Sequence, residues 1–151
     1  MNILIIGATS GIGRRLWEHY VSSGHNVIVV GRRKELLDNM ARNCPEHTLP
    51  VVCDISQTDS FDNALESIIR KHRHIDLAII CAGIGELNPK LDVETELSTL
   101  SVNVMGWANT VASIYRLLNG RNQVILLPSP LLVDYSLLLL PRHIVHQRHF
   151  R

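Results

Sequence analysis

Residues 1–13 read MNILIIGATSGIG, and this stretch decides the fold. Residues 3–6 are a short apolar run with the β-branched content that is typical of a buried parallel strand. Gly7 ends the run, and a glycine-rich turn leads directly into a helix-like segment at 14–23. Free N–H groups and the positive end of the helix dipole meet at such a turn. The stretch therefore predicts a phosphate site.

Each glycine of this turn has a steric reason. Gly7 allows the tight turn, Gly11 lets a pyrophosphate approach closely, and Gly13 lets the helix pack on the strand. We expect Thr9 and Ser10 to cap the free N–H groups of the helix. Because a strand precedes the motif and a helix follows it, the context favours a dinucleotide site over an ordinary glycine-rich turn.

The composition describes one globular domain. The chain has 151 residues, of which 46% are hydrophobic and 19% charged, enough to bury a core. A net charge of +1 gives no field that would attract nucleic acid or an anionic membrane. The apolar run after Met1 is too short for a signal peptide, and the leucine-rich stretch 131–140 is too short to span a bilayer. Three cysteines fit reduced thiols, so we expect a cytoplasmic location.

Strand-like and helix-like segments alternate along the chain. After the first strand, the apolar runs predict strands at 26–30, 49–53, 77–80 and 123–127, and the periodicity predicts helices at 34–43, 58–72 and about 93–118. This alternation is typical of an α/β protein with a doubly wound parallel sheet.

The second predicted strand is followed by Gly31, Arg32 and Arg33. In dinucleotide folds an acidic residue near this point binds the ribose 2′-OH of NAD, whereas an arginine accommodates the 2′-phosphate of NADP. The alternative is two solvated arginines at the start of a helix. Beside the glycine-rich turn, we interpret the pair as a preference for NADP(H) over NAD(H), with Arg32 favoured as the ligand.

The G-x-x-x-G-x-G spacing of Gly7, Gly11 and Gly13 resembles that of the short-chain dehydrogenase/reductase family. The resemblance covers about residues 1–127, and it implies a Rossmann-type doubly wound sheet truncated after about the fifth strand, followed by a divergent tail at 128–151. It implies hydride transfer between NADPH and a carbonyl or alcohol substrate. The cofactor contacts that it implies outside the three glycines are Thr9, Ser10, Ile12, Arg32, Arg33, Asp54, Ile55, Ala82 and Gly83.

Some of these positions have a specific expected role. An Asp at 54 hydrogen-bonds the adenine edge in the family; the alternative is that Asp54 starts a turn, with Ser56 capping the next helix. Ala82-Gly83 matches the end of the family's Asn-Asn-Ala-Gly, whereas Ile80-Cys81 departs from it, so that both amides are missing.

The resemblance implies two catalytic positions. Asn103, inside an apolar helix, corresponds to an Asn that anchors a water in the family's proton relay; a satisfied core amide is the alternative. Ser129 follows the fifth strand, where the family has its active-site Ser, but its flanking prolines fit a plain loop serine equally well.

The family's Tyr-x-x-x-Lys signature is absent, because none of Tyr20, Tyr115 and Tyr135 has a Lys four residues later. The chain is therefore either a reductase or an inactive NADP(H)-binding fragment, with a redox-sensing binding protein as a third reading. A carbonyl or alcohol substrate and self-association through the long helix around Asn103 are the expected partners. The tail contains histidines at three-residue spacing, His143, His146 and His149. They lack nearby carboxylate or thiolate partners, so they do not indicate a metal.

The tail also permits a different interpretation. For suitable synonymous codons, residues 143–148 (HIVHQR) read in a shifted frame as Tyr-Ser-Ala-Ser-Lys, at the distance after the fifth strand where the family has Tyr-x-x-x-Lys. Other synonymous codons give His and Glu in place of Tyr and Lys. We interpret residues 128–151 as an active-site segment read in the wrong frame.

Overall fold

The structure, a computed structural model, describes residues 1–72, 74–85, 88–117 and 123–126. One parallel sheet has the strand order β3-β2-β1-β4-β5. The strands are β1 (Asn2–Ile6), β2 (Asn26–Gly31), β3 (Thr48–Val52), β4 (Leu77–Ile80) and β5 (Gln123–Leu126). The helices are α1 (Gly11–Ser22), α2 (Lys34–Asn43), α3 (Thr58–His72), α4 (Val93–Leu100) and α5 (Trp107–Leu117), with a π-helical segment, η1 (Ser101–Gly106), between the last two. The predicted doubly wound parallel sheet is confirmed.

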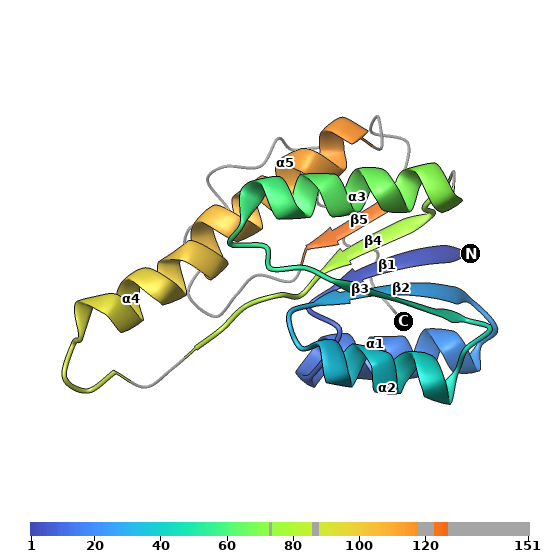
Figure 1. Cartoon of the computed structure of the whole chain (residues 1–151), viewed down its shortest axis with the longest axis horizontal. Coiled ribbons are helices and arrows are strands. Elements are labelled where there is room, and N and C mark those ends of the chain that lie inside the picture. Colours follow the sequence, from blue (N-terminus) through green and yellow to red (C-terminus); the bar gives the residue numbers. More distant parts are fainter. Residues whose placement is uncertain (73, 86–87, 118–122, 127–151) are drawn as a thin grey trace, which may run out of the picture.

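Helices cover both faces of the sheet, as a parallel sheet requires. Figure 1 shows α1 and α2 on one face and α3 and α5 on the other. β1 serves both layers because its side chains alternate. Ile3 and Ile5 pack in the cluster that contains Trp17 of α1, whereas Leu4 and Ile6 pack in the cluster that contains the side chains of α3.

The chain changes direction across the sheet at β1. The first three strands are laid down outward from β1, and β4 then pairs with the other side of β1. In register, Ile6 lies opposite Val30 of β2 and Ile80 of β4. The carboxyl ends of these strands therefore meet at one edge, at the switch point where α/β proteins bind ligands.

Several element boundaries differ from the sequence expectation, including those of β1, which begins at Asn2, and β2, which ends at Gly31. The first helix begins at Gly11 and not at residue 14, because the glycine-rich turn passes into the helix without a break. β3 is shifted by one residue and contains Pro50, which an edge strand tolerates because one side of it needs no ladder hydrogen bonds. The helix predicted over 93–118 contains a π-helical segment, and Leu127, the expected last residue of the fifth strand, lies outside the described residues.

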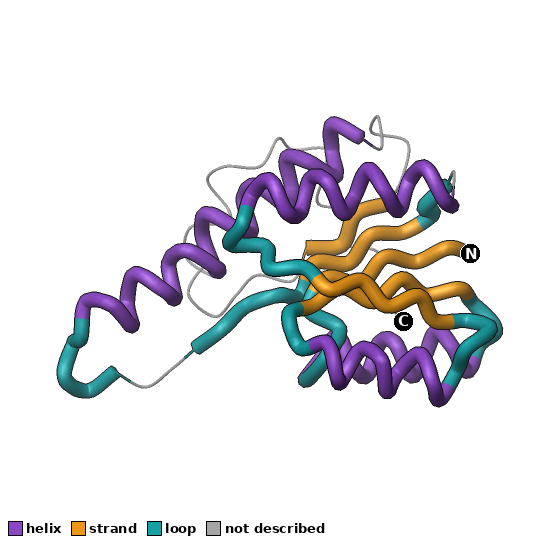
Figure 2. The backbone as a smooth tube through the Cα atoms, in the orientation of Figure 1, coloured by secondary structure: helices purple, strands orange, loops and turns teal. Residues whose placement is uncertain are grey.

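Helix α4 reaches away from the sheet, as both ribbon and tube show (Figures 1 and 2). Several apolar side chains on and beside it are exposed: Leu91, Val93, Leu97, Leu100 and Met105. None of the helices in the described part of the chain has the length and hydropathy needed to cross a membrane.

Candidate nucleotide site

The residues that follow four strands line one cavity of about 490 Å³ at the carboxyl edge of the sheet. Those after β1 are Gly7, Thr9, Ser10, Gly11 and Ile12; those at the end of β2 and beyond are Gly31, Arg32 and Arg33; those after β3 are Cys53, Asp54 and Ile55; and those after β4 are Cys81, Ala82, Gly83, Ile84 and Gly85. The structure thus brings together nearly all the cofactor contacts expected from the sequence. Gly13, in the first turn of α1, is not among the residues that line this cavity.

The three glycines of the turn occupy different surroundings. Gly7 has φ +88°, and a Cβ there would lie 2.6 Å from the Ala82 backbone. A Cβ on Gly13 would lie 2.2 Å from the Gly7 carbonyl oxygen, so Gly13 lets α1 pack against the end of β1. Gly11 has φ +53°, yet a Cβ there would meet no atom within 4 Å. The tight turn expected at Gly7 and the packing role expected of Gly13 are confirmed, while Gly11 borders open space at the helix N-terminus.

The expected capping by Thr9 and Ser10 is wrong. Ser10 holds the N-cap position of α1, but its side chain makes no capping hydrogen bond. Arg33 instead donates to Thr9 Oγ1 from Nε (3.1 Å) and Nη2 (2.7 Å), and from Nη2 to Ser10 Oγ (2.7 Å). Hydrogen bonds from a charged donor are stronger than those from a backbone N–H. The backbone N–H groups of this first turn are therefore left free of hydroxyl caps.

Asp54 forms both a turn and an ion pair. Its Oδ1 accepts hydrogen bonds from the backbone N–H of Ser56 (3.0 Å) and from the Ser56 hydroxyl (2.8 Å), which confirms the expected turn. Its Oδ2 lies 3.6 Å from Nη1 of Arg32, and both side chains are partly exposed. The segment after β2 is thereby linked to the segment after β3 across the cavity.

Cys81 directly follows β4 and lies beside the end of β1. Its thiol donates to the carbonyl oxygen of Ile6 at 3.2 Å. Burial raises the pKa of the Cys81 thiol to about 11, so the group is neutral at physiological pH. The departure from Asn at this position supplies a small uncharged side chain, and it removes an amide that could hydrogen-bond a ligand.

Asn103 is fully buried in η1, and both ends of its amide are used. Its Oδ1 accepts from the Ile84 N–H at 2.8 Å, and its Nδ2 donates to the Ile84 carbonyl at 2.7 Å. Asn103 is therefore the satisfied core amide that was the alternative in the sequence, and it fixes the loop after β4. Any role in a proton relay stays a prediction.

Two further residues, which were not predicted from the sequence, also shape the site. A Cβ on Gly106 would lie 2.7 Å from the carbonyl oxygen of Ile55, so this glycine lets η1 approach the loop after β3. Ile84 supplies the backbone groups that hold Asn103. The Asn-x-x-Gly spacing at 103–106 is a sequence feature from which the role of Gly106 could have been predicted, whereas no local sequence feature indicates the role of Ile84.

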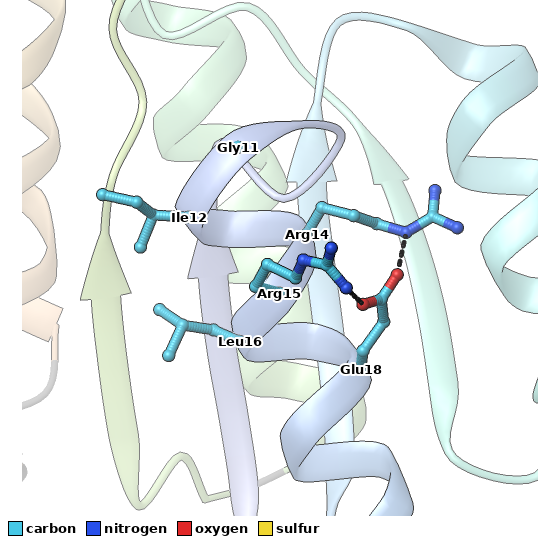
Figure 3. Close-up of a pocket in the computed structure, with 6 residues that line it drawn as sticks. All are labelled: Gly11, Ile12, Arg14, Arg15, Leu16 and Glu18. Carbon is cyan, nitrogen blue, oxygen red and sulfur yellow. Dashed lines mark hydrogen bonds and ion pairs between the residues drawn. The ribbon is translucent and has the colours of Figure 1, made fainter.

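A second hollow, of about 700 Å³, runs along the first turns of α1 (Figure 3). All six of its lining residues come from one helix: Gly11, Ile12, Arg14, Arg15, Leu16 and Glu18. Arg14 and Arg15 each contact a different oxygen of Glu18, at 3.1 Å in both cases. A single helix flank whose arginines share a carboxylate is a poorer ligand site than a cavity built by four strand ends. Ser129 lies outside the described residues.

The fold and this cavity define a class: α/β proteins that present a glycine-rich turn and a free helix N-terminus at the switch point of a parallel sheet, where nucleotides bind. The family model of the short chain dehydrogenases matches residues 1–127. The chain therefore belongs to the short-chain dehydrogenase family, a family of oxidoreductases that bind NAD(P).

Individual relatives agree with this assignment. The chain is 33% identical over 101 residues to L-xylulose reductase from Mus musculus, covering 67% of this chain and 39% of that protein. It is 31% identical over 85 residues to an NADP-dependent 3-hydroxy acid dehydrogenase from Salmonella typhimurium, covering 56% of this chain and 34% of that protein. The chain thus spans between a third and a half of the length of the curated relatives it matches.

Solved structures share the fold. The 3-ketoacyl-(acyl-carrier-protein) reductase from Brucella melitensis, complexed with NADH, superposes with a TM-score of 0.70 at 29% identity, over 76% of this chain and 48% of that chain. Serine dehydrogenase from Escherichia coli superposes with a TM-score of 0.75 at 22% identity, over 83% of this chain and 60% of that chain.

Proposed function

We propose that this chain binds NADP(H) and belongs to an enzyme that transfers a hydride between NADPH and a carbonyl or alcohol substrate. One observation carries the proposal: the open space beside Gly11, at a helix N-terminus without side-chain caps, lies in the same cavity as two arginines that follow β2. A pyrophosphate suits the first feature, and a 2′-phosphate suits the second.

Different segments of the chain would bind different parts of such a cofactor. The backbone from Gly7 to Gly13 would bind the pyrophosphate, Asp54 and Ile55 would face the adenine, and Ala82 and Gly83 would lie against the nicotinamide ribose. Asn103 would act as a positioning residue, because it fixes the loop that contains Ile84. When bound, the nicotinamide supplies the hydride. The mouse relative is an L-xylulose reductase and the Salmonella relative a 3-hydroxy acid dehydrogenase, which supports a carbonyl or alcohol substrate for this chain.

A second candidate function is binding without turnover. It is favoured by the sequence, which lacks the Tyr-x-x-x-Lys signature through which the family protonates its substrate. In this case the chain is an inactive NADP(H)-binding fragment or a redox-sensing binding protein.

The free state of Cys44, Cys53 and Cys81 supports a reducing compartment such as the cytoplasm.

We also propose that two copies associate through α4 and η1. Val93, Leu97, Leu100 and Val104 are spaced by four, three and four residues, which places them on one face of the helix. Their exposed fractions are 68%, 60%, 48% and 36%. Acidic residues gather at the start of α4 and Arg116 lies near the end of α5, so an antiparallel pairing would bring opposite charges together.

Nucleotide binding is tested with Gly11→Val. The new side chain would fill the space of the pyrophosphate, so we expect binding of NADPH and NADH to be lost in fluorescence titrations while the far-UV circular dichroism spectrum is retained. Gly24→Val is the matched control, because Gly24 also has a positive φ (+76°) with no atom within 4 Å of a Cβ, but it lies outside the cavity. Unchanged affinity in a folded Gly11→Val variant would mean that the turn is only structural.

A further inference from the structure

The hollow along the first turns of α1 has an apolar flank. Ile12 and Leu16 are one helical turn apart, and Figure 3 shows both side chains on the same side of α1, with Arg14 on the other side. Ile12 is 62% exposed and Leu16 is half-buried. On this face of the sheet α1 packs mainly against β1 and β2, and α2 packs against β2 and β3. The flank with Ile12 and Leu16 therefore has no neighbouring helix in the described part of the chain.

The strand beneath this flank is already covered. Leu77 and Ile79 of β4 are buried in the same cluster as Trp17, and Leu16 packs against the edge of that cluster. The hollow of about 700 Å³ lies along the helix itself, beside Leu16 and Ile12. The surface that lacks a partner is therefore the flank of α1 and not the sheet.

The charged side chains of the hollow do not balance. Arg14 and Arg15 both pair with Glu18, so two positive charges share one carboxylate. The side chain of Arg15 is 86% exposed, and its guanidinium is free to contact a second anion. A segment that fits this hollow is therefore apolar, to cover Ile12 and Leu16, and it contains a negative charge.

The chain contains one apolar segment of this kind that the fold has not placed. Residues 131–140 read LLVDYSLLLL, with six leucines and one valine, and they lie outside the described residues. Apolar side chains in this number favour burial against protein over exposure to water. Asp134 is the only charged residue between Arg121 and Arg142. The segment therefore has both the apolar side chains and the single carboxylate that the hollow requires.

The connection from the sheet is long enough for this segment to reach α1. Because the strands are parallel, β5 ends with Leu126 at the same edge of the sheet at which α1 begins. β5 is two strands away from β1, which is about 10 Å across the sheet, and a neighbouring layer lies about 10 Å above it. The direct path is then about 14 Å, whereas five extended residues span up to about 17 Å. Leu131 can therefore enter the hollow directly after β5.

We propose that residues 131–140 dock along α1 in the same chain, with leucine side chains against Ile12 and Leu16 and with Asp134 beside Arg15. This intramolecular interface goes beyond the nucleotide function and does not depend on it. It needs only apolar character, one carboxylate and sufficient reach, so it holds whether or not the tail is read in the wrong frame. Ile12 also lines the nucleotide cavity, so the docked segment borders that cavity.

Photo-cross-linking tests this contact in the full chain. Leu16→p-benzoylphenylalanine places the reactive ketone on the flank, and Arg15→p-benzoylphenylalanine places it at an exposed position that tolerates the larger side chain. Both should form a link to the tryptic peptide 122–142, with fragment masses that locate it at 131–140, in a species of monomer mass. Val52→p-benzoylphenylalanine is the control, because Val52 is exposed at the opposite edge of the sheet and should give no such link.

A double-mutant cycle measures the coupling between the flank and the segment. Leu16→Ser and a variant with serine at all of 137–140 are compared singly and together by urea denaturation. The combined increase in the unfolding constant should be smaller than the product of the single increases by about threefold or more, because both changes remove the same contacts. Val52→Ser in place of Leu16→Ser should give the simple product.

Three outcomes would overturn the proposal. Cross-links from positions 15 and 16 that do not include 131–140 would assign the hollow to a different partner or to solvent. Links to 131–140 found only in a species of dimer mass would make a second copy of the chain the occupant. Multiplicative effects in the cycle with Leu16→Ser would show that the segment does not contact this flank.

Discussion

The Cys81 thiol links the stability of this fold to pH. Its folded-state pKa is raised to about 11 by burial, above the ordinary value of 9.0. The folded state therefore favours the protonated thiol, and this contribution is complete below pH 9 and disappears as the pH rises through 11. We expect the free energy of unfolding to fall by about 1 kcal/mol more in wild type than in Cys81→Ser between pH 8 and pH 10.

Urea denaturation at the two pH values measures this difference. Cys44→Ser, which replaces a thiol at the C-terminal end of α2 and outside the cavity, is the control for the substitution itself. Parallel curves for wild type and Cys81→Ser would show that the thiol does not titrate differently in the folded and unfolded chains.

At the scale of residues, the sequence predicted the glycines better than the arginines. Gly7 and Gly13 are required by local sterics, which a strand, a turn and a helix determine within seven residues. The partners of Arg32 and Arg33 depend on Asp54 and on Thr9, which come from other strand ends. Long flexible side chains choose among such partners only after the sheet has formed, so their contacts could not be predicted from the sequence.

At the scale of elements, the π-helical segment η1 is the main feature that hydrophobic periodicity missed. The apolar stripe predicts an uninterrupted helix, and six residues, Ser101–Gly106, form wider π turns instead. The segment brings Asn103 to the backbone of Ile84 and Gly106 to the carbonyl of Ile55. These contacts join η1 to two loops that are distant in the sequence, so a local pattern of residues cannot predict them.

Asn103→Ala should destabilise the protein by about 2–3 kcal/mol, because it leaves the N–H and carbonyl groups of Ile84 without partners. Asn109→Ala is the matched control: its Nδ2 is buried without a hydrogen-bond partner in the described structure, so its loss should change stability by less than about 0.5 kcal/mol. Chemical denaturation measures both. Equal effects would mean that the two hydrogen bonds to Ile84 contribute little.

The exposed stripe of α4 gives a prediction about assembly. Leu97→Asp should convert a dimer to a monomer in sedimentation velocity, because it places a charge in the middle of an apolar interface. Ser98→Asp adds the same charge one residue away, on an exposed position beside the stripe, and should leave the dimer intact. A wild type that sediments as a monomer would remove the proposed self-association.

At the scale of the whole molecule, the parallel sheet followed from the sequence because each strand is short, apolar and followed by a turn. The same patterns placed α2, α3 and β4 at their observed bounds. Residues 128–151 offer no such alternation, and they lie outside the described residues. The interpretation of this tail as an active-site segment in the wrong frame therefore stays a prediction, and the nucleotide sequence of the reading frame tests it directly.

If the frame interpretation is correct, binding and catalysis separate in this chain. A tyrosine phenol has an ordinary pKa near 10, and it needs a neighbouring cation to exchange protons near neutral pH. Neither Tyr20 nor Tyr115 has a lysine four residues later, and the sequence contains no lysine after Lys90. We therefore expect the chain to bind NADPH without oxidising it in the presence of aldehydes, ketones or sugars, as followed by the absorbance of the reduced nicotinamide.

The matched protein is expressed from a gene with one nucleotide inserted upstream of codon 143. The insertion puts the shifted frame and its continuation into translation. It should bind NADPH with the same affinity, because the residues that line the cavity all lie between Ile6 and Val102. It should also reduce at least one carbonyl substrate. Turnover by the 151-residue chain itself would contradict the frame interpretation. It would also mean that a proton donor other than a Tyr-Lys pair completes the site.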